Sequence, residues 1–578
     1  LMALSLRRDV SSVFGRALRR ALPDLSAEQV SSIAVAKVCD SRQARGHYQC
    51  DAALRLRDRG ESTRAVADRI VGELRDPMFE HADVGGPGFI SVTFDNHFLA
   101  ERLRNFRLDP VRRLSGADRK RIIVDMSSPN VAKRMHVGHL RSTVIGEAIA
   151  QLLIAQGHDV VKVNHVGDFG TQFGLILAML RKKNVDVNTL DIDQVEEVYR
   201  EAKRLAEQSK EFAADAHRCV VALQKGDPEA TMVWTAVKDV SRAEYNRLYE
   251  RLGIHNLIER GESSYQSLLP ETVRDLVDLG IARETDGAIC IFEPSSSESD
   301  EDGFPLIIRK SDGGFTYDTT DLAAIRYRFT EERADHVIYL TDKGQSEHFR
   351  KVFEAARRAQ WVPPDAVCEF IGFGIMLGED GKRFRTRDGG AVRLDYLLDQ
   401  AVKRARHVIE GRDELIPNLD VDETAVAVGV SAVRYADLSR QRESDMVFSL
   451  EAMLDLKGNT SVYLQYALCR INSILRQCAG RCEFKDFDGL SIATDEERDV
   501  AVHVLRYDDV LDDASKSLQP HLLCHWAFSL ASALNFMYQR CPVVGDPRMK
   551  PRSQLLFLAG TTLRHAFNVL GINALERM

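Results

Sequence analysis

VDMSSPNVAKRMHVGHLRSTVIG, residues 124–146, is the stretch that decides the fold of this chain. Isoleucine and valine at 122–124 predict a β-strand, a Ser-Ser-Pro segment interrupts it, and apolar residues return at helical spacing after His139. A strand, a polar loop and a helix therefore follow one another. Free N–H groups and the positive dipole end at the start of such a helix suit a phosphate, and His136 and His139 stand there with Gly138 between them.

A second strand-loop-helix pattern follows in VVKVNHVGDFGTQFGLILAML, residues 160–180. Two successive units of this kind imply a parallel sheet with right-handed crossovers. Ligands of such sheets bind outside the carboxyl ends of the strands, where both polar loops fall. The predicted fold class is α/β: a Rossmann-like catalytic domain with a parallel sheet and an inserted helical segment at about residues 181–260, a small N-terminal α/β domain, and a C-terminal all-α bundle.

Composition narrows the class of protein. The chain has 578 residues, of which 44% are hydrophobic and 28% charged, so it can form several domains with their own cores. No apolar run approaches the roughly 18 residues of a membrane-spanning helix, and a cytoplasmic protein without a membrane partner is expected. The ten cysteines are scattered and complete no zinc pattern, so no metal site is predicted. The net charge of −8 argues against binding nucleic acid by bulk electrostatics but is compatible with a local basic surface.

Changes of composition along the chain predict three domains. Residues 1–115, with a helix and a glycine-punctuated strand, indicate a small α/β domain. Residues 116–413 form the catalytic domain, and residues 414–578 are almost wholly helical. The basic run at 111–121 is as consistent with a solvated connection as with an RNA contact. The segment 293–305, rich in Ser, Asp and Glu, predicts a surface loop.

Two further segments carry side chains suited to a charged substrate. Tyr317 and Asp321 are four residues apart, which places them on one face of a predicted helix where they could grip one ligand. Four cations in a flexible turn suit a triphosphate, and the turn after a glycine-rich strand holds Lys382, Arg383, Arg385 and Arg387. In the C-terminal region, one predicted helix face carries Val462, Tyr466, Ile471 and Ile474.

The motifs together resemble a known family. MHVGHLRS, residues 135–142, resembles the HIGH element of class I aminoacyl-tRNA synthetases, and SSPNVAKRMHVGHLRST together with NHVGDFGTQFG resembles arginyl-tRNA synthetase. The likeness continues through RGESSY (260–265), TYDTTD (316–321), IYLTDKGQ (338–345), GNTSVYLQYA (458–467) and the ending GINALERM. It extends to GHYQCDAA and GGPGFISV near the start, so the resemblance covers nearly the whole chain.

The resemblance implies an arginine–tRNA ligase. Such an enzyme uses ATP, with Mg²⁺, to convert L-arginine to arginyl-adenylate, and transfers it to the terminal adenosine of tRNA(Arg), releasing AMP and pyrophosphate. Negative charge develops on phosphoryl oxygens, so positioning and electrostatic donors should dominate. By resemblance, the catalytic residues are His136, His139 and Lys133. The ATP-binding residues are His136, Gly138, His139, Lys133, Arg383 and Arg385. The arginine-binding residues are Asp125, Ser128, Pro129, Asn130, His139, Glu262, Tyr317, Asp321 and Gln345.

Each of these residue types has an ordinary alternative. Two histidines three residues apart could be simple helix-start residues or could share a metal, but no Cys or carboxylate partner is evident. Asp321 or Glu262 alone would be interpreted as a solvated carboxylate, because most acidic residues are exposed. Their occurrence within matching motifs favours a role in holding the guanidinium group.

One departure from the family pattern concerns the second phosphate-binding turn. Class I synthetases commonly carry a KMSKS loop, whereas this chain has KRFRTR at 382–387. By resemblance to arginyl members that also lack KMSKS, Lys133 would compensate. The alternative, that Arg383, Arg385 and Arg387 bind the phosphates directly, stays open.

Transfer RNA would contact the two outer domains. The resemblance implies tRNA contacts in the C-terminal region at Val447, Lys457, Asn459, Tyr463 and Tyr466, although core packing explains the two tyrosines equally well. A monomer is expected. Two other classes remain as alternatives: a small-molecule nucleotidyltransferase with the same sheet, and a non-catalytic tRNA-binding paralogue. The large regions outside the catalytic domain count against the first, and the intact motif residues count against the second.

Overall fold

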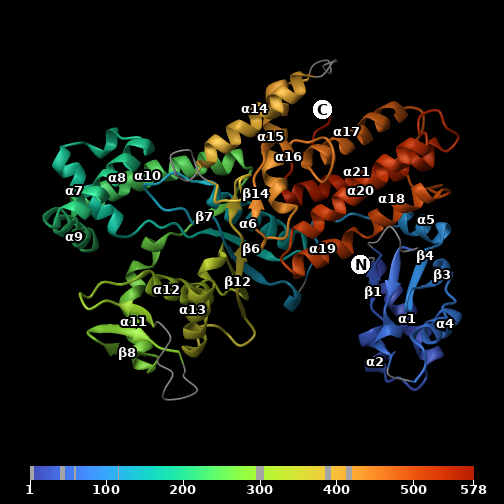
Figure 1. The fold of residues 1–578 in the computed structure, drawn as a ribbon, viewed down its shortest axis with the longest axis horizontal. Helices are drawn as coiled ribbons and strands as arrows, with labels where there is room; N and C mark the ends of the chain where they lie inside the picture. The colour runs from blue at the N-terminus through green and yellow to red at the C-terminus, as the bar shows by residue number, and fades with distance from the viewer. Residues whose placement is uncertain are drawn as a thin grey trace. The chain divides into compact units, whose positions relative to one another are not determined.

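The structure is a computed structural model that describes residues 5–39, 46–57, 60–112, 114, 116–293, 305–384, 392–411 and 419–578. The chain divides into two compact units (Figure 1). Unit 1 comprises Leu1–Pro110, Arg412–Thr424 and Asp455–Met578, and unit 2 comprises Val111–Gly411 and Ala425–Leu454. The predicted surface loop, apart from its two end residues, and the cations Arg385 and Arg387 lie outside the described residues.

Unit 2 is built around a five-stranded sheet in the order β12-β11-β5-β6-β7. Every neighbouring pair is parallel, which confirms the predicted sheet. The chain proceeds from β5 to β6 and β7 on one side, and later adds β11 and β12 on the other side. Open α/β sheets bind ligands at the carboxyl ends of the strands next to such a reversal. The strands are β5 (Arg121–Asp125), β6 (Asp159–Asn164), β7 (Leu257–Glu259), β11 (His336–Asp342) and β12 (Val367–Phe373).

The two predicted helices follow their strands. Helix α6 (Val137–Ala155) comes after β5 and contacts β5, β6 and β11, and α7 (Thr171–Lys183) comes after β6. A Cβ atom at Gly146 would lie 2.6 Å from Met126 Cβ, so only glycine lets α6 approach the end of β5 this closely. The start of α6 is thereby fixed against the carboxyl edge of the sheet.

A hydrophobic core cluster joins Ile123, Val163 and Val337 of the sheet to helices and to a small second sheet. The second sheet is antiparallel, with the order β10-β9-β8. The elements concerned are α11 (Leu269–Asp278), β8 (Ala282–Thr285), β9 (Ala288–Ile291), β10 (Leu306–Arg309), α12 (Tyr317–Thr330) and α13 (Ser346–Arg358). The predicted pair Tyr317 and Asp321 therefore does share one helix, α12.

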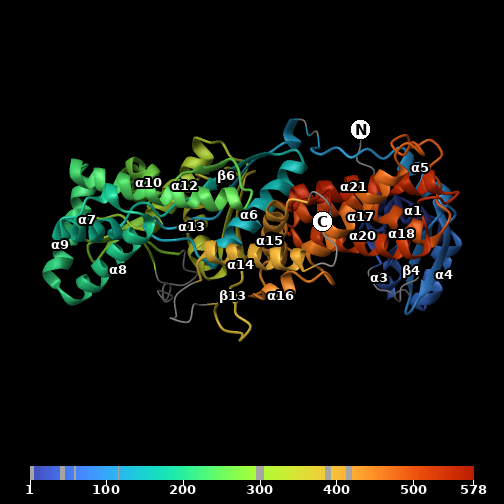
Figure 2. The ribbon, with the colours of Figure 1, turned by 90° about the horizontal axis from the view of Figure 1, so that it is seen from above.

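The helical character expected of residues 181–260 is confirmed for most of this span, but its end is wrong, because β7 (Leu257–Glu259) belongs to the parallel sheet. Three long helices pack with α7 and with one another, and they lie together in both views (Figure 1 and Figure 2). They are α8 (Ile192–Gln208), α9 (Lys210–Gln224) and α10 (Pro228–Arg251). The remaining helices and strands of unit 2 are α14 (Leu394–Glu410), α15 (Val421–Leu438), α16 (Leu450–Met453), β13 (Met376–Leu377) and β14 (Met446–Val447), with short 3₁₀ turns η2 (Gly116–Asp118), η3 (Val187–Thr189), η4 (Glu262–Leu268) and η5 (Lys343–Gln345).

The N-terminal segment of unit 1 carries an antiparallel sheet in the order β1-β2-β4-β3, covered by helices. The apolar face predicted for its first helix, at Val10, Phe14, Ala17 and Leu18, is buried as expected. Its elements are α1 (Leu6–Ala21), α2 (Ala27–Ile33), β1 (Ala36–Val38), β2 (Tyr48–Cys50), α3 (Ala52–Arg55), α4 (Thr63–Gly72), β3 (Phe79–Gly85), β4 (Phe89–Phe94) and α5 (Asn96–Arg104).

The C-terminal segment of unit 1 is the predicted helical bundle. Its helices are α17 (Ser461–Cys478), α18 (Asp495–Leu505), α19 (Tyr507–Lys516), α20 (His521–Arg540) and α21 (Met549–Leu570). Asp509 on α19 accepts hydrogen bonds from Ser5 Oγ at 2.5 Å and from Arg7 N at 3.0 Å, which ties this bundle to α1 within one unit. The division of the chain into three domains stays a prediction.

The apolar face that was predicted for α17 in the bundle is wrong. Val462 and Ile471 are buried, but Tyr466 is 43% exposed. The buried side of α17 follows Leu464, Leu468 and Ile471 instead, because helical spacing alone does not say which of two adjoining stripes meets the neighbouring helices. Among the described residues, no helix is both long enough and apolar enough to cross a membrane.

A buried ion pair joins α6 to the sheet and gives a test of this packing. Glu147 accepts hydrogen bonds from Lys162 Nζ at 2.8 and 3.0 Å, and the two side chains are 4% and 6% exposed. We expect Glu147→Ala to lower the free energy of unfolding by about 3–5 kcal/mol, since it leaves a buried ammonium group unpaired. Urea denaturation followed by circular dichroism measures the change.

Glu197→Ala is the matched control for this prediction. Glu197 pairs with Arg200 on the surface of α8, where both side chains are about half exposed. Its removal should cost at most about 1 kcal/mol. Equal losses in the two variants would contradict the structural role of the buried pair.

Candidate active site

The loop between β5 and α6 has an unusual backbone. Ser127, Ser128 and Ala132 have φ angles of 71°, 51° and 65°, in the left-handed region that side chains disfavour. Each such residue costs on the order of 1–2 kcal/mol, so the surrounding structure must hold the loop in place. Gly167 in the loop after β6 lies against it, and a Cβ there would meet Asn130 Oδ1 at 2.3 Å.

Helix α10 supports this loop from the inserted region. Three of its side chains, four residues apart, face the loop: Ser241 Oγ accepts from Ala132 N at 3.0 Å, Tyr245 donates to Asn130 O at 2.8 Å, and the Tyr249 hydroxyl lies 2.8 Å from Ser127 Oγ. Asn164 Nδ2 at the end of β6 also donates to the Tyr249 hydroxyl, at 3.1 Å. The inserted helices are therefore part of the site.

The two histidines of the motif lie at the start of α6. His136 is the N-cap residue, and its Nδ1 accepts a hydrogen bond from Gly138 N at 3.1 Å. His139 Nδ1 accepts in the same way from His136 N at 3.1 Å. The ring centroids are 4.0 Å apart. Each histidine thus satisfies one of the unpaired N–H groups that every helix start exposes.

These contacts fix the protonation of both rings. A backbone N–H can only donate, so each Nδ1 must be unprotonated and each neutral ring carries its hydrogen on Nε2. Burial and the neighbouring Lys133 lower the pKa of His136, and burial together with His136 lowers the pKa of His139 to about 3. Both rings are therefore neutral near pH 7, each with one N–H donor left for a ligand.

Gly138 permits this arrangement. A Cβ at position 138 would lie 2.9 Å from Cε1 and 3.0 Å from Nδ1 of His136. Any larger residue would push the imidazole away from the backbone N–H that orients it. The glycine between the two histidines is therefore required by the ring position.

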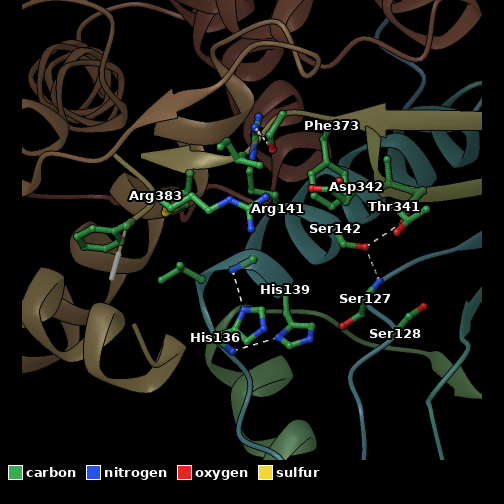
Figure 3. Close-up of a pocket in the computed structure, with 17 residues that line it drawn as sticks. Ser127, Ser128, His136, His139, Arg141, Ser142, Thr341, Asp342, Phe373 and Arg383 are labelled. Atoms are coloured by element: carbon green, nitrogen blue, oxygen red, sulfur yellow. Dashed lines mark hydrogen bonds between the residues drawn. The ribbon is translucent and has the colours of Figure 1, made fainter. Parts of the chain in front are cut away.

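A cavity of about 570 Å³ opens at this helix start (Figure 3). It lies at the carboxyl ends of β5, β11 and β12, as the topology predicts, and several of its walls are apolar. Of the predicted site residues, five line it together: Ser128, His136, Gly138, His139 and Arg383. Its other walls include Ser127, Arg141, Ser142, Leu340, Asp342, Phe373, Gly374, Ile375 and Met376.

Arg141 joins α6 to the far wall of the cavity. Its guanidinium donates to Asp437 Oδ1 at 2.9 Å, to Gly374 O at 2.6 Å and to Ser444 O at 3.0 Å, and the residue is only 1% exposed. The donors of Arg141 are thus engaged within the chain. The residue fixes the distance between the histidines and the end of β12.

Lys133 does not line the cavity, although its charge acts on His136. Its Nζ lies 5.4 Å from the centre of the Tyr199 ring, on α8 of the inserted region. Arg383, by contrast, lines the cavity, and its backbone pairs with Leu377 in a short hairpin after β13. The structure therefore places Arg383, and not Lys133, in the cavity wall.

A carboxylate cluster forms at the same edge of the sheet. Glu262 begins η4, directly after Gly261, whose Cβ would lie 2.5 Å from Asp168 Oδ1. Asp168 is fully buried and is held by Lys238 Nζ at 2.5 Å and by Ser263 Oγ at 2.6 Å. Burial, then the negative charges of Asp168 and Asp321, raise the pKa of Glu262 to about 8. Two of the predicted guanidinium ligands, Glu262 and Asp321, are therefore close enough to repel one another.

The other predicted arginine-binding residues surround this edge. Asp125 is buried and pairs with Arg328 Nη2 at 2.6 Å, so its carboxylate already has a cation within the chain. Ser128 N donates to Asn164 Oδ1 at 3.0 Å, and Pro129 O accepts from Gly167 N at 3.1 Å. Tyr317 is 63% exposed at the start of α12, and Gln345 is exposed in η5.

The predicted tRNA-binding residues differ in exposure. Tyr466 is 43% and Val447 41% exposed, and Lys457 is exposed as well. Tyr463 is half-buried, with its hydroxyl 2.7 Å from Asn535 Nδ2 and its ring near Phe528. Asn459 is half-buried. Of the two tyrosines, Tyr466 has the surface that a stacking base would need.

Several residues around the site had no role in the sequence-based prediction. Ser241, Tyr245 and Tyr249 recur at helical spacing, which is a signal, but their partners are more than a hundred positions away. His348 contacts two carboxylates of α12. His165 stacks on Tyr265 at 5.7 Å between ring centroids. Only the folded chain brings these side chains to the motif.

Three family models match successive parts of the chain. The catalytic domain of tRNA synthetases class I (R) matches residues 107–450. The DALR anticodon binding domain matches residues 464–578, and the arginyl tRNA synthetase N terminal domain matches residues 12–94. The three models together cover nearly the whole chain.

Curated relatives and solved structures agree with these matches. The arginine–tRNA ligase of Synechococcus elongatus is 41% identical over 548 residues, covering 92% of this chain and 93% of that protein. That of a Cyanothece species is 40% identical over 579 residues, covering 97% and 98%. The crystal structure of arginyl-tRNA synthetase from Plasmodium falciparum has a TM-score of 0.84 at 28% identity and 100% coverage of both chains. The Thermus thermophilus arginyl-tRNA synthetase shares the fold, with a TM-score of 0.78 at 23% identity, covering 99% of this chain and 100% of that chain. The chain belongs to the arginyl-tRNA synthetases, the class I arginine–tRNA ligases.

Proposed function

We propose that unit 2 forms arginyl-adenylate at the carboxyl edge of its sheet and then transfers the arginyl group to tRNA(Arg). In the first step a carboxylate oxygen of arginine attacks the α-phosphorus of ATP, and the bond from that phosphorus to the bridging oxygen of pyrophosphate breaks. The observation that supports this assignment is the presence of a donor-lined cavity and a carboxylate cluster at one sheet edge. The cavity suits the polyphosphate, and the cluster suits the guanidinium group.

ATP is assigned to the cavity lined by His136, His139 and Arg383. Because both imidazoles are neutral with hydrogen on Nε2, they act as hydrogen-bond donors to phosphoryl oxygens and not as acids. Their burial strengthens such donors, since a nearby apolar wall lowers the local dielectric constant. The apolar wall at Phe373 and Met376 suits the adenine ring.

Arginine is assigned to the space between this cavity and the carboxylate cluster. Asp321 and Glu262 would accept from the guanidinium group, with the exposed ring of Tyr317 beside it. Ser128, Pro129, Asn130, His139 and Gln345 would hold the amino-acid end. Asp125 would act less directly, because its carboxylate is paired with Arg328.

Mg²⁺ fits this scheme as an ion carried by the substrate. Among the described residues, no group of three or more His, Cys, Asp or Glu side chains could hold a metal ion. Mg²⁺ usually keeps several waters and binds through phosphates with one or two carboxylates, and Asp342 in the cavity wall could supply one. A cytoplasmic location, a monomeric state and the tRNA contacts at Val447, Lys457, Asn459, Tyr463 and Tyr466 stay predictions.

Arginine-dependent exchange of pyrophosphate with ATP tests the proposal. We expect exchange to require L-arginine and to be fastest with tRNA(Arg) present, because the family often needs tRNA for the first step. Exchange without arginine would indicate a nucleotidyltransferase of the same fold. Binding of tRNA without any exchange would indicate a non-catalytic paralogue.

The variant Asp321→Ala tests the assignment of arginine in the same assay. We expect it to abolish arginine activation while ATP binding stays largely intact, since a guanidinium ligand is lost and the ATP cavity is not. Glu331→Ala, which removes an exposed carboxylate just beyond α12, is the control and should leave the arginine KM unchanged. A near-normal arginine KM in Asp321→Ala would contradict the assignment.

The role of Lys133 is tested against that of Arg383. We expect Lys133→Ala to slow adenylate formation by up to about a hundredfold while weakening ATP binding much less, because it removes a charge that acts on the transition state. Arg383→Ala, a change in the cavity wall, should mainly raise the KM for ATP. Single-turnover formation of the adenylate and ATP titration measure the two effects. Equal rates in Lys133→Ala and the parent would refute the role of Lys133.

The raised pKa of Glu262 predicts that a proton is released when arginine binds. With its pKa raised to about 8, the carboxyl group is mostly protonated at pH 7 in the free protein. A bound guanidinium cation favours the carboxylate, so arginine should displace about one proton, and its affinity should rise with pH up to about pH 8 and then level off. Calorimetry at pH 7 in two buffers of different ionisation enthalpy counts the proton. Glu262→Gln should remove the release, and unchanged release in that variant would assign it to another group.

A further inference from the structure

His348 lies between two carboxylates of α12, one of which is a predicted ligand of arginine. It belongs to the first turn of α13, and its Nε2 is 2.7 Å from Asp321 Oδ2. Its Nδ1 is 3.3 Å from Asp318 Oδ1. Both carboxylates come from the first turns of α12, where Asp318 is 7% exposed. The imidazole therefore bridges a predicted substrate ligand and a buried acidic residue.

Two carboxylates favour the cationic form of this ring. The hydrogen bond from Nε2 to Asp321 requires a hydrogen on Nε2, because a carboxylate can only accept, and the Asp318 carboxylate at ion-pair distance from Nδ1 favours a second hydrogen there. Although burial by itself lowers the pKa of His348, the contacts with Asp318 and Asp321 raise it to about 9. His348 has a carboxylate within ion-pair distance of both ring nitrogens, whereas the ion pairs of His81, His165 and His336 each involve one nitrogen only.

The imidazolium occupies one oxygen of Asp321. Oδ2 receives the His348 hydrogen bond, whereas the nearest nitrogen to Oδ1 in an ion-pair contact is His165 Nε2, at 3.9 Å. Glu262 shows the same pattern, because its Oε2 accepts from Phe169 N at 3.3 Å. Each of the two carboxylates thus has one oxygen engaged by the protein, which leaves the other for a ligand.

We propose that His348 is a positioning residue of the arginine site: its hydrogen bond holds Asp321 turned so that the guanidinium group meets one oxygen of Asp321 and one of Glu262. This rests on the proposed function. A planar guanidinium has several N–H groups spread over a fork and can reach two separated oxygens, whereas the ammonium of lysine presents its three N–H groups from a single nitrogen. His348 would therefore contribute to specificity for arginine without touching it.

A purely structural role would give a different pattern. The His348 ring also lies edge-on to Phe349 at 5.0 Å and 5.1 Å from the Tyr317 ring, so loss of packing could by itself disturb the site. Packing loss would lower stability or affect both substrates. Loss of the Asp321 hydrogen bond would act on arginine alone.

Replacing His348 with glutamine or with asparagine separates the positioning role from the packing role. The amide nitrogen of His348→Gln can take the place of Nε2 and keep a hydrogen bond to Asp321, whereas that of His348→Asn takes the place of Nδ1 and keeps only the contact with Asp318. We expect the arginine KM in tRNA-supported pyrophosphate exchange to rise about tenfold in His348→Gln and further in His348→Asn, with the ATP KM within about twofold of the parent. Glu347→Gln, on the same turn but exposed, is the matched control and should change neither.

Defined outcomes would overturn the proposal. These are an arginine KM within twofold of the parent in both variants, an equal rise in both, or a parallel rise in the ATP KM. Because the comparison uses a parent enzyme that shows arginine-dependent exchange, its failure is distinct from failure of the proposed function, in which the parent itself would be inactive.

A second measurement needs no variant. In protein labelled with ¹⁵N-histidine, we expect one ring to remain doubly protonated at pH 8, where an ordinary histidine is neutral. We assign that ring to His348, because a carboxylate lies within ion-pair distance of each of its two nitrogens. If every histidine is neutral at pH 8, the imidazolium bridge does not exist and the proposal fails even if neither variant folds.

Discussion

The hydroxyl of Tyr249 meets both polar loops of the sheet edge, at Ser127 Oγ after β5 and at Asn164 Nδ2 at the end of β6. Much of the site depends on that contact and on those of Ser241 and Tyr245, since they hold a loop whose backbone is strained at Ser127, Ser128 and Ala132. Strained residues persist only where their surroundings over-determine them. The helix that holds this loop, α10, belongs to the inserted region. The insertion is therefore needed to shape the site.

The site separates neutral donors from paired charges. His136 and His139 are kept neutral by burial and by the backbone N–H groups that their Nδ1 atoms accept. At the same edge of the sheet, acidic side chains are stabilised by cations of the chain, as Asp125 is by Arg328 and Asp168 by Lys238. Unpaired charges would be costly in such partly buried positions. Among the described residues Glu262 has no cation at ion-pair distance, and burial together with the charges of Asp168 and Asp321 raises its pKa to about 8, so it is mostly protonated at pH 7.

Glycine positions show how closely this arrangement is packed. At Gly138, Gly146 and Gly261 an added Cβ would come within 2.9 Å of a histidine ring, a methionine side chain or the Asp168 carboxylate. None of the three needs a left-handed backbone; each is needed because another group lies where a side chain would be. The motif glycines of this chain therefore report close contacts between segments, which explains why they occur beside the functional side chains.

The sequence by itself determined the parallel sheet, the helix that starts at His136, the helical insertion and the C-terminal bundle, because each depends on local periodicity and on residues that interrupt it. It also pointed to the residues that line the cavity, since Ser128, His136, Gly138 and His139 are neighbours in the chain. Tertiary structure alone decided which tyrosine of α17 is exposed, that Lys133 turns to Tyr199, and that His348 joins Asp318 and Asp321. These features depend on contacts between distant segments, and local sequence patterns carry no information about which distant surface a side chain will meet.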